Sequence, residues 1–361
     1  MVITSKHHFK NVSEKILFYY SYLNIRVISP QETMLQKYHL VFLIAVLLFV
    51  SSCTSSANTI EQQAAVDQGN INVFFCPSEN CESALLEFLD SAEHSIHCAL
   101  FDIGLTSVQE KLLEKEKEIE VMVVTDDDYL KKFNHPFVKP DSHGLMHDKF
   151  CVIDGKKVST GSMNPTGNDA HKNNNNLLLI ESVLLAENYE DEFQEMWNGV
   201  FKKGNKVEKP SLLLNGKRIK NYFCPEDSCA EQVKEELQKA ETSIYFMTFS
   251  FTHDGIANIL LLKNLDGVEV KGVMEVKQIS EHSEFNRLMQ NQVDVRKDGN
   301  KNNLHHKVFI IDGKTVVTGS FNPSANGDQK NDENVIIIED AEMAKEFTEE
   351  FWKVYGEAAS P

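Results

Sequence analysis

The chain has 361 residues, of which 42% are hydrophobic and 25% are charged, and its formal net charge is −18 at pH 7. This length allows two ordinary domains and a sizeable core. The acidity does not favour non-specific binding of duplex DNA, because that affinity comes mostly from Lys and Arg side chains that neutralise phosphates. It leaves room for a local positive pocket and is otherwise typical of a well-solvated surface.

The first strong signal along the chain is an unbroken apolar run of eleven residues, Leu40–Val50, which follows Lys37 and precedes Ser51-Ser52-Cys53. A mature helix needs about 20 residues to span a bilayer, so this run is too short. It fits the apolar region of a secretory signal. Val-Ser-Ser-Cys resembles a lipoprotein signal box, in which Cys53 would be lipidated and become the first residue. The alternative is a buried or anchoring apolar helix.

The N-terminal 70 residues then divide into three expected segments. Residues 1–33 do not resemble a signal sequence, so we expect Met34 to be the true start and the upstream segment to be untranslated or disordered. Residues 34–53 would be the signal peptide, and the polar residues 54–70 a flexible tether. Residues after Cys53 include 31 basic and 52 acidic ones, a formal charge of −21. We expect an exported lipoprotein, anchored to the membrane on its extracytoplasmic side.

The rest of the chain consists of two similar copies. Val73-Phe-Phe-Cys-Pro matches Asn221-Tyr-Phe-Cys-Pro, and similar strand and helix patterns follow in each copy. Apolar spacing predicts helices over Ala84–Ala92 and Glu231–Ala240, and strands over Glu120–Val124 and Val268–Val273. We expect one domain over residues 71–201, a linker over 202–218 and a second domain over 219–356. Alternating strands and helices predict α/β layers, and the duplication predicts a pseudo-two-fold pair.

The seven cysteines agree with export. Cys53 is assigned to lipid, and the matching segments Cys76–Cys81 and Cys224–Cys229 each begin and end with a cysteine. A zinc site is conceivable, but neither pair has a CxxC or His set at finger spacing nearby. Two short disulfide loops of modest stabilising effect are the simpler account in an oxidising compartment. Cys98 and Cys151 lie in apolar strand-like runs and are expected to be buried thiols.

The most specific feature is a string that occurs in both copies, 158 residues apart. Its first copy is His147-Asp-Lys149-Phe-Cys-Val-Ile-Asp154, six residues, then Gly161-Ser162-Met-Asn164. The second is His305-His-Lys307-Val-Phe-Ile-Ile-Asp312, six residues, then Gly319-Ser320-Phe-Asn322. The apolar, β-branched surroundings predict a strand, on which the His and the Lys share one face. Two like half-sites are therefore expected.

Asp154 and Asp312 are each followed by glycine between two strand-like runs, which is a strong hairpin signal. Both carboxylates are candidate catalytic groups, but turn formation or scaffold hydrogen bonding is favoured for them. The hairpin returns into Gly-Ser-x-Asn, which would place Ser162, Asn164 and their counterparts Ser320 and Asn322 beside the His and Lys face. These residues are candidates for binding a substrate phosphate.

Paired histidines suit a double displacement at phosphorus. One neutral imidazole attacks and forms a phosphohistidine, while the other, protonated, donates to the departing alkoxide and then activates water. Lys149 and Lys307 can hold the non-bridging oxygens as charge builds, with the amides of Asn164 and Asn322 as further donors. This chemistry needs no cofactor or metal, and no carboxylate cluster in the sequence offers a convincing metal site.

These residues resemble the HKD motif of the phospholipase D superfamily, His-x-Lys, four residues, Asp, six residues, Gly-Ser-x-Asn. The resemblance covers about residues 71–355. It implies two pseudo-two-fold-related α/β/α sandwich domains with one active site at their interface, so a monomer would hold an intramolecular pseudo-dimer site. Members of the family include phospholipases, bacterial nucleases, phosphatidyl transferases and a tyrosyl-DNA phosphodiesterase.

One departure concerns the acidic residue that, in the family, often accepts a hydrogen bond from the catalytic histidine. Glu333 fits this role in the second copy, whereas the same offset places Asn175 in the first. An amide can orient the ring but cannot stabilise an imidazolium as a carboxylate does. Family precedent favours His147 as nucleophile and His305 as general acid, although a carboxylate partner would make His305 the better base. Alternatively, Asn173–Asn176 is simply a polar loop.

Two functions are favoured by these residues. The first is a phospholipase D that acts on a phosphatidylcholine-type phospholipid and gives phosphatidic acid, kept near its substrate by the lipid anchor. The second is an exported non-specific endonuclease, favoured by the small size of the two halves. Two weaker alternatives are a phosphatidyl transferase and an inactive phosphate-binding module, and the intact motifs argue against the inactive module.

Overall fold

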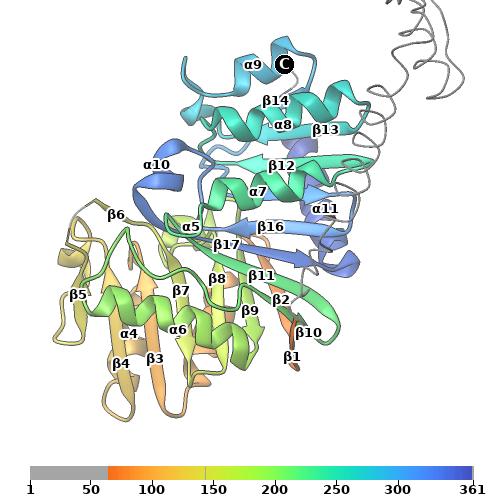
Figure 1. The fold of residues 1–361 in the computed structure, drawn as a ribbon. Helices are drawn as coiled ribbons and strands as arrows, with labels where there is room; N and C mark the ends of the chain where they lie inside the picture. The colour runs from red at the N-terminus through yellow and green to blue at the C-terminus, as the bar shows by residue number, and fades with distance from the viewer. Residues whose placement is uncertain (1–63, 143, 360–361) are drawn as a thin grey trace, which may run out of the picture. The chain divides into compact units, whose positions relative to one another are not determined.

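A computed structural model describes residues 64–142 and 144–359 (Figure 1). The expected signal peptide and Cys53 lie outside these residues, and so does most of the expected tether. Among the helices that are described, none combines the length and the apolar character that crossing a membrane requires.

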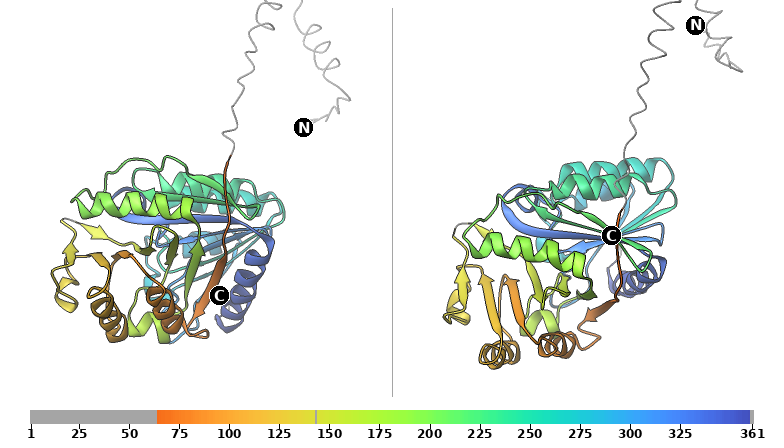
Figure 2. Two further views of the ribbon diagram at one scale, coloured as in Figure 1. Left: turned by 90° about the horizontal axis from the view of Figure 1, so that it is seen from below. Right: turned by 60° about the horizontal axis from the view of Figure 1, so that its bottom comes forward.

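The first half of the chain forms a seven-stranded mixed sheet. Its strands, in spatial order, are β2 (Ile71–Cys76), β9 (Asn175–Glu181), β8 (Lys157–Gly161), β7 (Lys149–Ile153), β3 (Ser95–Leu100), β4 (Glu120–Thr125) and β5 (Val138–Pro140). The helices α3 (Cys81–Asp90) and α4 (Thr106–Lys115) lie on one face, and α6 (Val183–Trp197) lies on the other (Figure 2). This is the expected α/β/α arrangement.

The second half repeats this arrangement in a larger, ten-stranded sheet. Its main path runs β1 (Ala65–Asp67), β10 (Ser211–Leu214), β11 (Lys217–Cys224), β17 (Asn331–Glu339), β16 (Thr315–Gly319), β15 (Lys307–Ile311), β12 (Ser243–Thr248), β13 (Glu269–Met274) and β14 (Asp294–Lys297). The helices on one face are α7 (Cys229–Gln238), α8 (Asp254–Leu265) and α9 (Phe285–Gln290), and α11 (Ala341–Glu357) packs on the other. The last strand of the sheet, β6 (Leu145–Met146), pairs with β17 and comes from the first half.

One shared core joins the two halves. Tyr189 on α6 packs edge-on against Phe150 of the first sheet and Phe223 of the second, with ring centroids 5.0 Å apart in both pairs. Phe75 of the first sheet meets Phe347 of α11 in the same way, also at 5.0 Å. All five side chains are buried. Each fully buried aromatic contributes about 2 kcal/mol through loss of apolar surface to water, so separating the halves would expose a large apolar area.

The expected elements are present with small shifts of their ends. The helix predicted over Ala84–Ala92 begins earlier, at Cys81, because Asn80 caps it by accepting a hydrogen bond from the Ser83 N–H at 3.3 Å. The helix predicted over Glu231–Ala240 is α7, which begins at Cys229. Both expected disulfides, Cys76–Cys81 and Cys224–Cys229, are formed.

The expectation that Cys98 and Cys151 are free thiols is wrong. They form a third disulfide, because β3 and β7 run antiparallel and place the two residues directly opposite each other. The bond closes a separation of 53 residues, against five for the other two.

Two strands lie in segments that we expected to be irregular. β1 belongs to the end of the expected tether and β10 to the expected linker, and the two pair in parallel. The side chain of Asp67 explains why this region is ordered. It accepts hydrogen bonds from the Ser182 hydroxyl at 2.7 Å and the Leu184 N–H at 3.0 Å, which ties β1 to the start of α6. The domain bounds themselves stay predictions.

Candidate active site

The two motifs meet because each half pairs with the strand that follows the other half's motif. The His147 N–H donates to the carbonyl of Asp332, and the His305 N–H donates to the carbonyl of Asn174, both at 2.9 Å. Asn174 and Asp332 are themselves 158 residues apart, as the two histidines are. The contacts of one half therefore recur in the other with the partners exchanged, which is what a pseudo-two-fold axis between the halves requires.

His147 is buried, with 7% of its surface exposed, and its ring is fixed on two sides. Its Nδ1 lies 2.8 Å from Oε2 of Glu333, and the edge of its ring meets Phe101 with centroids 5.0 Å apart. When Nδ1–H donates to the carboxylate, the lone pair is left on Nε2. The carboxylate thus selects the tautomer that can attack phosphorus.

His305 has the corresponding geometry with an amide in place of the carboxylate. Its Nδ1 lies 2.8 Å from Oδ1 of Asn175, and its ring meets Phe249 with centroids 4.8 Å apart. The sequence had suggested that Glu333 would serve His305, in the same half. That pairing is wrong, because the partners are exchanged between the halves. Asn175 is part of the site and of strand β9, so the alternative that Asn173–Asn176 is simply a polar loop is also wrong at this position.

The two lysines lie beside the histidines, but not on one shared strand. The strand expected through His147 and Lys149 is interrupted between β6 and β7, and β15 begins only at Lys307. Lys149 Nζ donates to the carbonyl of His147, and Lys307 Nζ donates to that of His305 at 2.7 Å. Each ammonium also lies over an aromatic ring, Phe101 at 5.1 Å and Phe249 at 5.2 Å. Both lysines are 97% buried. Among residues 64–142 and 144–359, neither ammonium group donates to a carboxylate, so this buried site is short of negative charge.

The Gly-Ser-x-Asn segments line the same site. The hydroxyl of Ser162 accepts from the Asn176 N–H at 3.0 Å, and that of Ser320 accepts from the Asn334 N–H at 2.9 Å. The glycines before these serines have φ angles of 130° and 135°. A Cβ on Gly161 would lie 2.5 Å from the Asn176 carbonyl oxygen, so only glycine permits this close approach.

The amides of the two Gly-Ser-x-Asn segments differ in their surroundings. Asn164 donates from Nδ2 to Asp169 at 2.7 Å. Its Oδ1, and that of Asn322, are buried with no hydrogen-bond partner among residues 64–142 and 144–359. A donor from outside this set, such as a protonated substrate group or water, would satisfy them.

The electrostatics of the site favour an anion. Burial and the positive charges of Lys149 and Lys307 hold the pKa of His147 well below its ordinary value, and burial and Lys307 do the same for His305. Burial lowers the pKa of Lys149 to about 8, and burial with the charge of Lys149 lowers that of Lys307 well below its usual range. A bound phosphodiester carries the negative charge that would reverse these shifts.

The carboxylates of the site are affected by burial in the opposite sense. Burial raises the pKa of Glu333 to about 7, although Lys149 and hydrogen bonds from Asn331 and Ser320 act against it. Near neutral pH, Glu333 therefore changes from a carboxylic acid to a carboxylate. The acceptor that fixes the tautomer of His147 is consequently sensitive to pH in the physiological range.

Asp154 and Asp312 are not brought to the histidines. Each follows the far end of its motif strand, five residues and about 16 Å from the lysine. Asp154 accepts hydrogen bonds from three successive backbone N–H groups, Glu93 to Ser95, at 2.7–3.3 Å, and Asp312 does the same for Glu241 to Ser243. Both have positive φ, 55° and 53°. The geometry supports the scaffold role.

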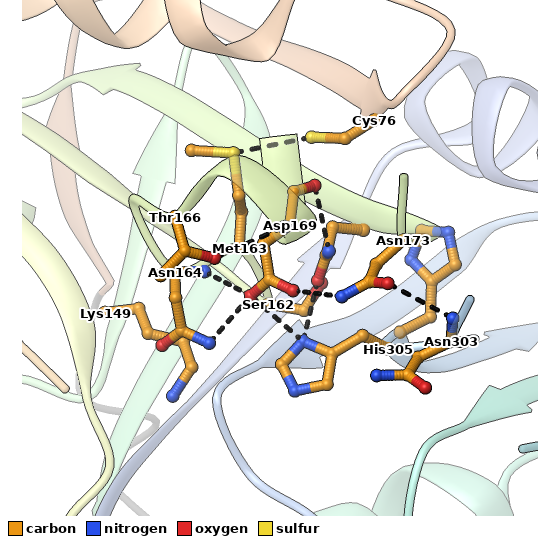
Figure 3. Close-up of polar contacts among 12 residues, drawn as sticks. Cys76, Lys149, Ser162, Met163, Asn164, Thr166, Asp169, Asn173, Asn303 and His305 are labelled. Atoms are coloured by element: carbon orange, nitrogen blue, oxygen red, sulfur yellow. Dashed lines mark hydrogen bonds and ion pairs between the residues drawn. The ribbon is translucent and has the colours of Figure 1, made fainter. Parts of the chain in front are cut away.

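Several residues of the site were missed by sequence reasoning. Asp169, on the short helix α5 (Gly167–His171), has an Oδ2 that lies 3.6 Å from Nδ1 of His305 (Figure 3). A second exchanged pair involves the residues that directly follow the two histidines: Asn334 donates to Asp148 at 2.6 Å, and Asn176 Nδ2 lies 3.0 Å from Nδ1 of His306. Extending the alignment at an offset of 158 residues would have indicated this second pair, since Asn176 and Asn334 match.

Two groups of carboxylates in the described part of the chain are close enough together to hold a metal ion. They are Asp126 to Asp128 and the set Glu192, Glu195 and Glu226. Neither group includes a motif residue.

The geometry defines an enzyme that acts on phosphodiester bonds. A family model described as "Cardiolipin synthase, PLD-like domain" matches residues 85–197 and 233–355, one match in each half and together more than half of the chain. The chain therefore belongs to the phospholipase D superfamily, with two PLD-like domains, and is a phosphodiester hydrolase.

Curated relatives match over the length of about one half. A phospholipase D from Rickettsia conorii is 33% identical over 157 residues, which are 40% of this chain and 78% of the relative. A mitochondrial cardiolipin hydrolase from Xenopus laevis is 31% identical over 136 residues, 34% of this chain and 65% of the relative.

Two solved structures are also similar. Phosphatidylserine synthase from Haemophilus influenzae covers 80% of this chain and 87% of its own, with a TM-score of 0.63 at 12% identity, which supports the fold. Nuc from Salmonella typhimurium, a phospholipase D family member, is 30% identical and covers 40% of this chain and 98% of its own, with a TM-score of 0.39.

Proposed function

We propose that this protein is a phospholipase D that hydrolyses the headgroup phosphodiester of a phosphatidylcholine-type phospholipid and releases phosphatidic acid. The observation that carries the reaction type is the crossed half-site geometry, in which two histidines, each oriented at Nδ1, share a buried site with two lysines. The choice of a lipid substrate rests on the names of the relatives and on the acidity of the chain, which opposes binding of polyanionic nucleic acid.

In the proposed reaction, Nε2 of His147 attacks phosphorus and the bond to the headgroup oxygen breaks. Protonated His305 donates its Nε2 proton to that oxygen, so the headgroup leaves as a neutral alcohol. The phosphohistidine is then attacked by water, whose proton passes to His305, and the P–N bond breaks to give phosphatidic acid. His147 is favoured as nucleophile because its ring gains positive charge as it attacks, and the Glu333 carboxylate in direct contact with Nδ1 can stabilise that charge, whereas the Asn175 amide in contact with His305 cannot.

The lysines and the motif amides would bind the substrate phosphate. Lys149 and Lys307 neutralise the non-bridging oxygens, and Asn164 and Asn322 hold the phosphate from the Gly-Ser-x-Asn side. The Ser162 hydroxyl, which was expected to bind phosphate as well, instead donates to Asn175 Oδ1 at 3.0 Å. Binding would restore the charge of lysines whose pKa is depressed by burial. The negative charge of the substrate would thus both bind to the lysines and restore their positive charge.

We also propose that the protein is exported and anchored to a membrane through lipid on Cys53, on the extracytoplasmic side. The support is the apolar run Leu40–Val50 and the Val-Ser-Ser-Cys box that ends it. Such an anchor would keep a monomeric enzyme at a lipid surface. Intact-mass measurement of membrane-extracted protein tests it, and a mature chain that begins at an unlipidated residue other than Cys53 would refute it.

Substrate class is tested with the purified protein in the presence of EDTA. Vesicles of phosphatidylcholine, vesicles of cardiolipin and supercoiled plasmid DNA are incubated in parallel, and choline, phosphatidic acid and nicked DNA are measured. Choline release without nicking is expected. Cleavage of cardiolipin alone would change the lipid, and nicking without lipid cleavage would replace the proposal by the endonuclease alternative.

The mechanism is tested with two variants whose roles differ. His147→Asn should abolish turnover and any phosphoenzyme. His305→Asn should lower turnover by at least about a thousandfold, because both proton transfers are lost, yet still allow a phosphoenzyme to form from a substrate with a good leaving group. A phosphoenzyme in His147→Asn and none in His305→Asn would reverse the two roles. Full activity in both variants would sink the double displacement.

A further inference from the structure

The two histidines have different hydrogen-bond partners at Nδ1, and the two halves differ at one further position near these partners. His147 faces the carboxylate of Glu333, whereas His305 faces the amide of Asn175 at the equivalent place. An amide supplies no negative charge to an imidazolium, and His305 is the residue that must be protonated to act as general acid. Something else has to favour its protonated form.

Asp169 lies where that charge is needed. Its Oδ2 is 3.6 Å from Nδ1 of His305 (Figure 3). The same Nδ1 makes the hydrogen bond with Asn175 Oδ1. Asp169 is 96% buried. Burial raises its pKa, but the charge of His305 and hydrogen bonds from Asn173 and Asn164 outweigh burial and leave the pKa below its ordinary value. The carboxylate is therefore ionised at neutral pH.

Asp169 is also held rigidly. It accepts from the Asn164 N–H at 2.9 Å, from Asn164 Nδ2 at 2.7 Å and from Asn173 Nδ2 at 2.6 Å. Asn173 in turn accepts from the N–H of Asn303, two residues before His305, at 3.1 Å (Figure 3). The carboxylate is thus fixed relative to both the motif amide of its own half and the segment that precedes β15 and carries His305.

The equivalent position in the second half is Gly327, which has no side chain. Thr166 and Ser324 are equivalent caps, since each accepts from the N–H three residues later, which belongs to Asp169 in one half and Gly327 in the other. A Cβ on Gly327 would lie 2.4 Å from the carbonyl oxygen of Asn322, so the backbone there does not accommodate a side chain. The pair Asn175 and Asp169 in one half thus corresponds to the pair Glu333 and Gly327 in the other.

We infer that Asp169 is the positioning residue that supplies the negative charge for His305, in exchange for the glutamate that position 175 lacks. The carboxylate near His305 comes from the short helix α5, whereas the carboxylate at His147 comes from strand β17, and each histidine has one carboxylate nearby. This inference rests on the proposed role of His305 as general acid. It makes Asp169 necessary for the protonated state of His305 and not for the attack by His147.

The pH profile of kcat separates this role from a structural one. In Asp169→Asn, the limb on which activity falls with rising pH should move at least about one unit toward lower pH, and kcat at pH 7.5 should fall about 10- to 100-fold. Asn175→Glu added to Asp169→Asn returns a carboxylate to His305 without restoring the hydrogen bonds to Asn164, and it should return the limb and most of kcat.

A second readout uses the leaving group. Phosphatidylcholine loses an alkoxide that needs a proton, whereas phosphatidyl-p-nitrophenol loses a stable phenolate that does not. Asp169→Asn should therefore slow the first substrate far more than the second. The matched control is Asp328→Asn on α10 (Ala325–Gln329), since Asp328 accepts only from the Ala230 N–H at 2.8 Å and should leave both rates unchanged.

The outcomes are distinguishable from failure of the proposed function. Plasmid DNA, which also loses an alkoxide, replaces phosphatidylcholine if the wild type prefers it, so substrate class is decided separately. If His305→Asn is fully active, the proposed mechanism itself fails. If His305→Asn is inactive but Asp169→Asn keeps the wild-type limb, or Asn175→Glu does not restore it, the inference about Asp169 is overturned. Circular dichroism checks folding, and Asp169→Ser carries the same test if Asp169→Asn unfolds.

Discussion

Oε2 of Glu333 lies 2.8 Å from Nδ1 of His147, although the two residues are 186 positions apart and belong to different halves of the chain. The contact is matched by Asn175 and His305 with the halves reversed. Each histidine is thus oriented by a residue that its own half does not contain. The active site therefore depends on both halves not only for its histidines but for the state of each histidine.

The pH dependence of activity should reflect Glu333. Its pKa is raised to about 7 by burial, so a fall in pH through 7 protonates it and removes the acceptor for Nδ1–H of His147. The pKa of His147 itself is held well below 6.5, so its own protonation does not cause a loss of activity just below pH 7. We expect kcat/KM of the wild type to fall about tenfold per pH unit below 7.

Glu333→Gln should abolish that limb and lower kcat/KM at pH 8 by about 10- to 100-fold, because the amide orients the ring without stabilising its charge. Glu339→Gln, on the same strand but paired with Lys220 at 3.1 Å, is the matched control and should keep the wild-type profile. An unchanged acid limb in Glu333→Gln would show that another group is responsible.

Anion binding should weaken with rising pH because of Lys149. Burial lowers its pKa to about 8, so the ammonium loses its proton above that value. Inhibition by inorganic phosphate is expected to decrease between pH 7.5 and 9.5. Lys149→Arg keeps a charge over this range and should flatten the dependence, even though it impairs catalysis. A parallel decline in both proteins would place the titration elsewhere.

Asp154 should matter for stability and not for turnover. Replacing it with alanine leaves three backbone N–H groups, those of Glu93, His94 and Ser95, without their acceptor. The expected loss in the free energy of unfolding is about 2–4 kcal/mol, measured by urea denaturation. The kcat at 25 °C should stay within about twofold of the wild type. A large loss of kcat in the folded variant would show that Asp154 takes part in catalysis after all.

The disulfide between Cys98 and Cys151 should stabilise the protein more than the two short ones. On chain entropy, closing 53 residues contributes about 4 kcal/mol and closing five residues about 2 kcal/mol. The double variant Cys98→Ala with Cys151→Ala should therefore unfold at a lower urea concentration than Cys76→Ala with Cys81→Ala. The reverse order would mean that native-state packing, not loop length, sets the difference.

Sequence reasoning reached the layers of the fold and the four central residues of the site. The His-x-Lys spacing placed His147 near Lys149, and the equal spacing of the repeat placed the second pair in the same way, although each histidine lies just before the strand on which it was expected. It did not reach the exchange of partners, because an alignment of the halves shows which residues are equivalent and not which are in contact. The pairing of β6 with β17, which brings Glu333 to His147, links segments that have no local signal in common.

The third disulfide and Asp169 were missed for different reasons. Cys98 and Cys151 become neighbours only when β3 and β7 pair, and neither residue has a counterpart in the second half that would have suggested a pattern. Asp169 was within reach, since it lies on the segment between Asn164 and Asn175 that the offset alignment already covered. Its counterpart in the second half is Gly327, so an alignment of the two halves shows no shared residue at this position.

The short caps Thr166 and Ser324, which place Asp169 and Gly327 at equivalent points, have a consequence for how such a chain could be rearranged. A symmetric pair of two first halves would give every histidine an asparagine and an aspartate, and a pair of two second halves would give every histidine a glutamate and a glycine. Either way, each imidazole would keep one carboxylate. Each half therefore supplies the other half's histidine with one carboxylate, Glu333 at 2.8 Å and Asp169 at 3.6 Å, so the number of carboxylates per histidine does not depend on which halves are paired.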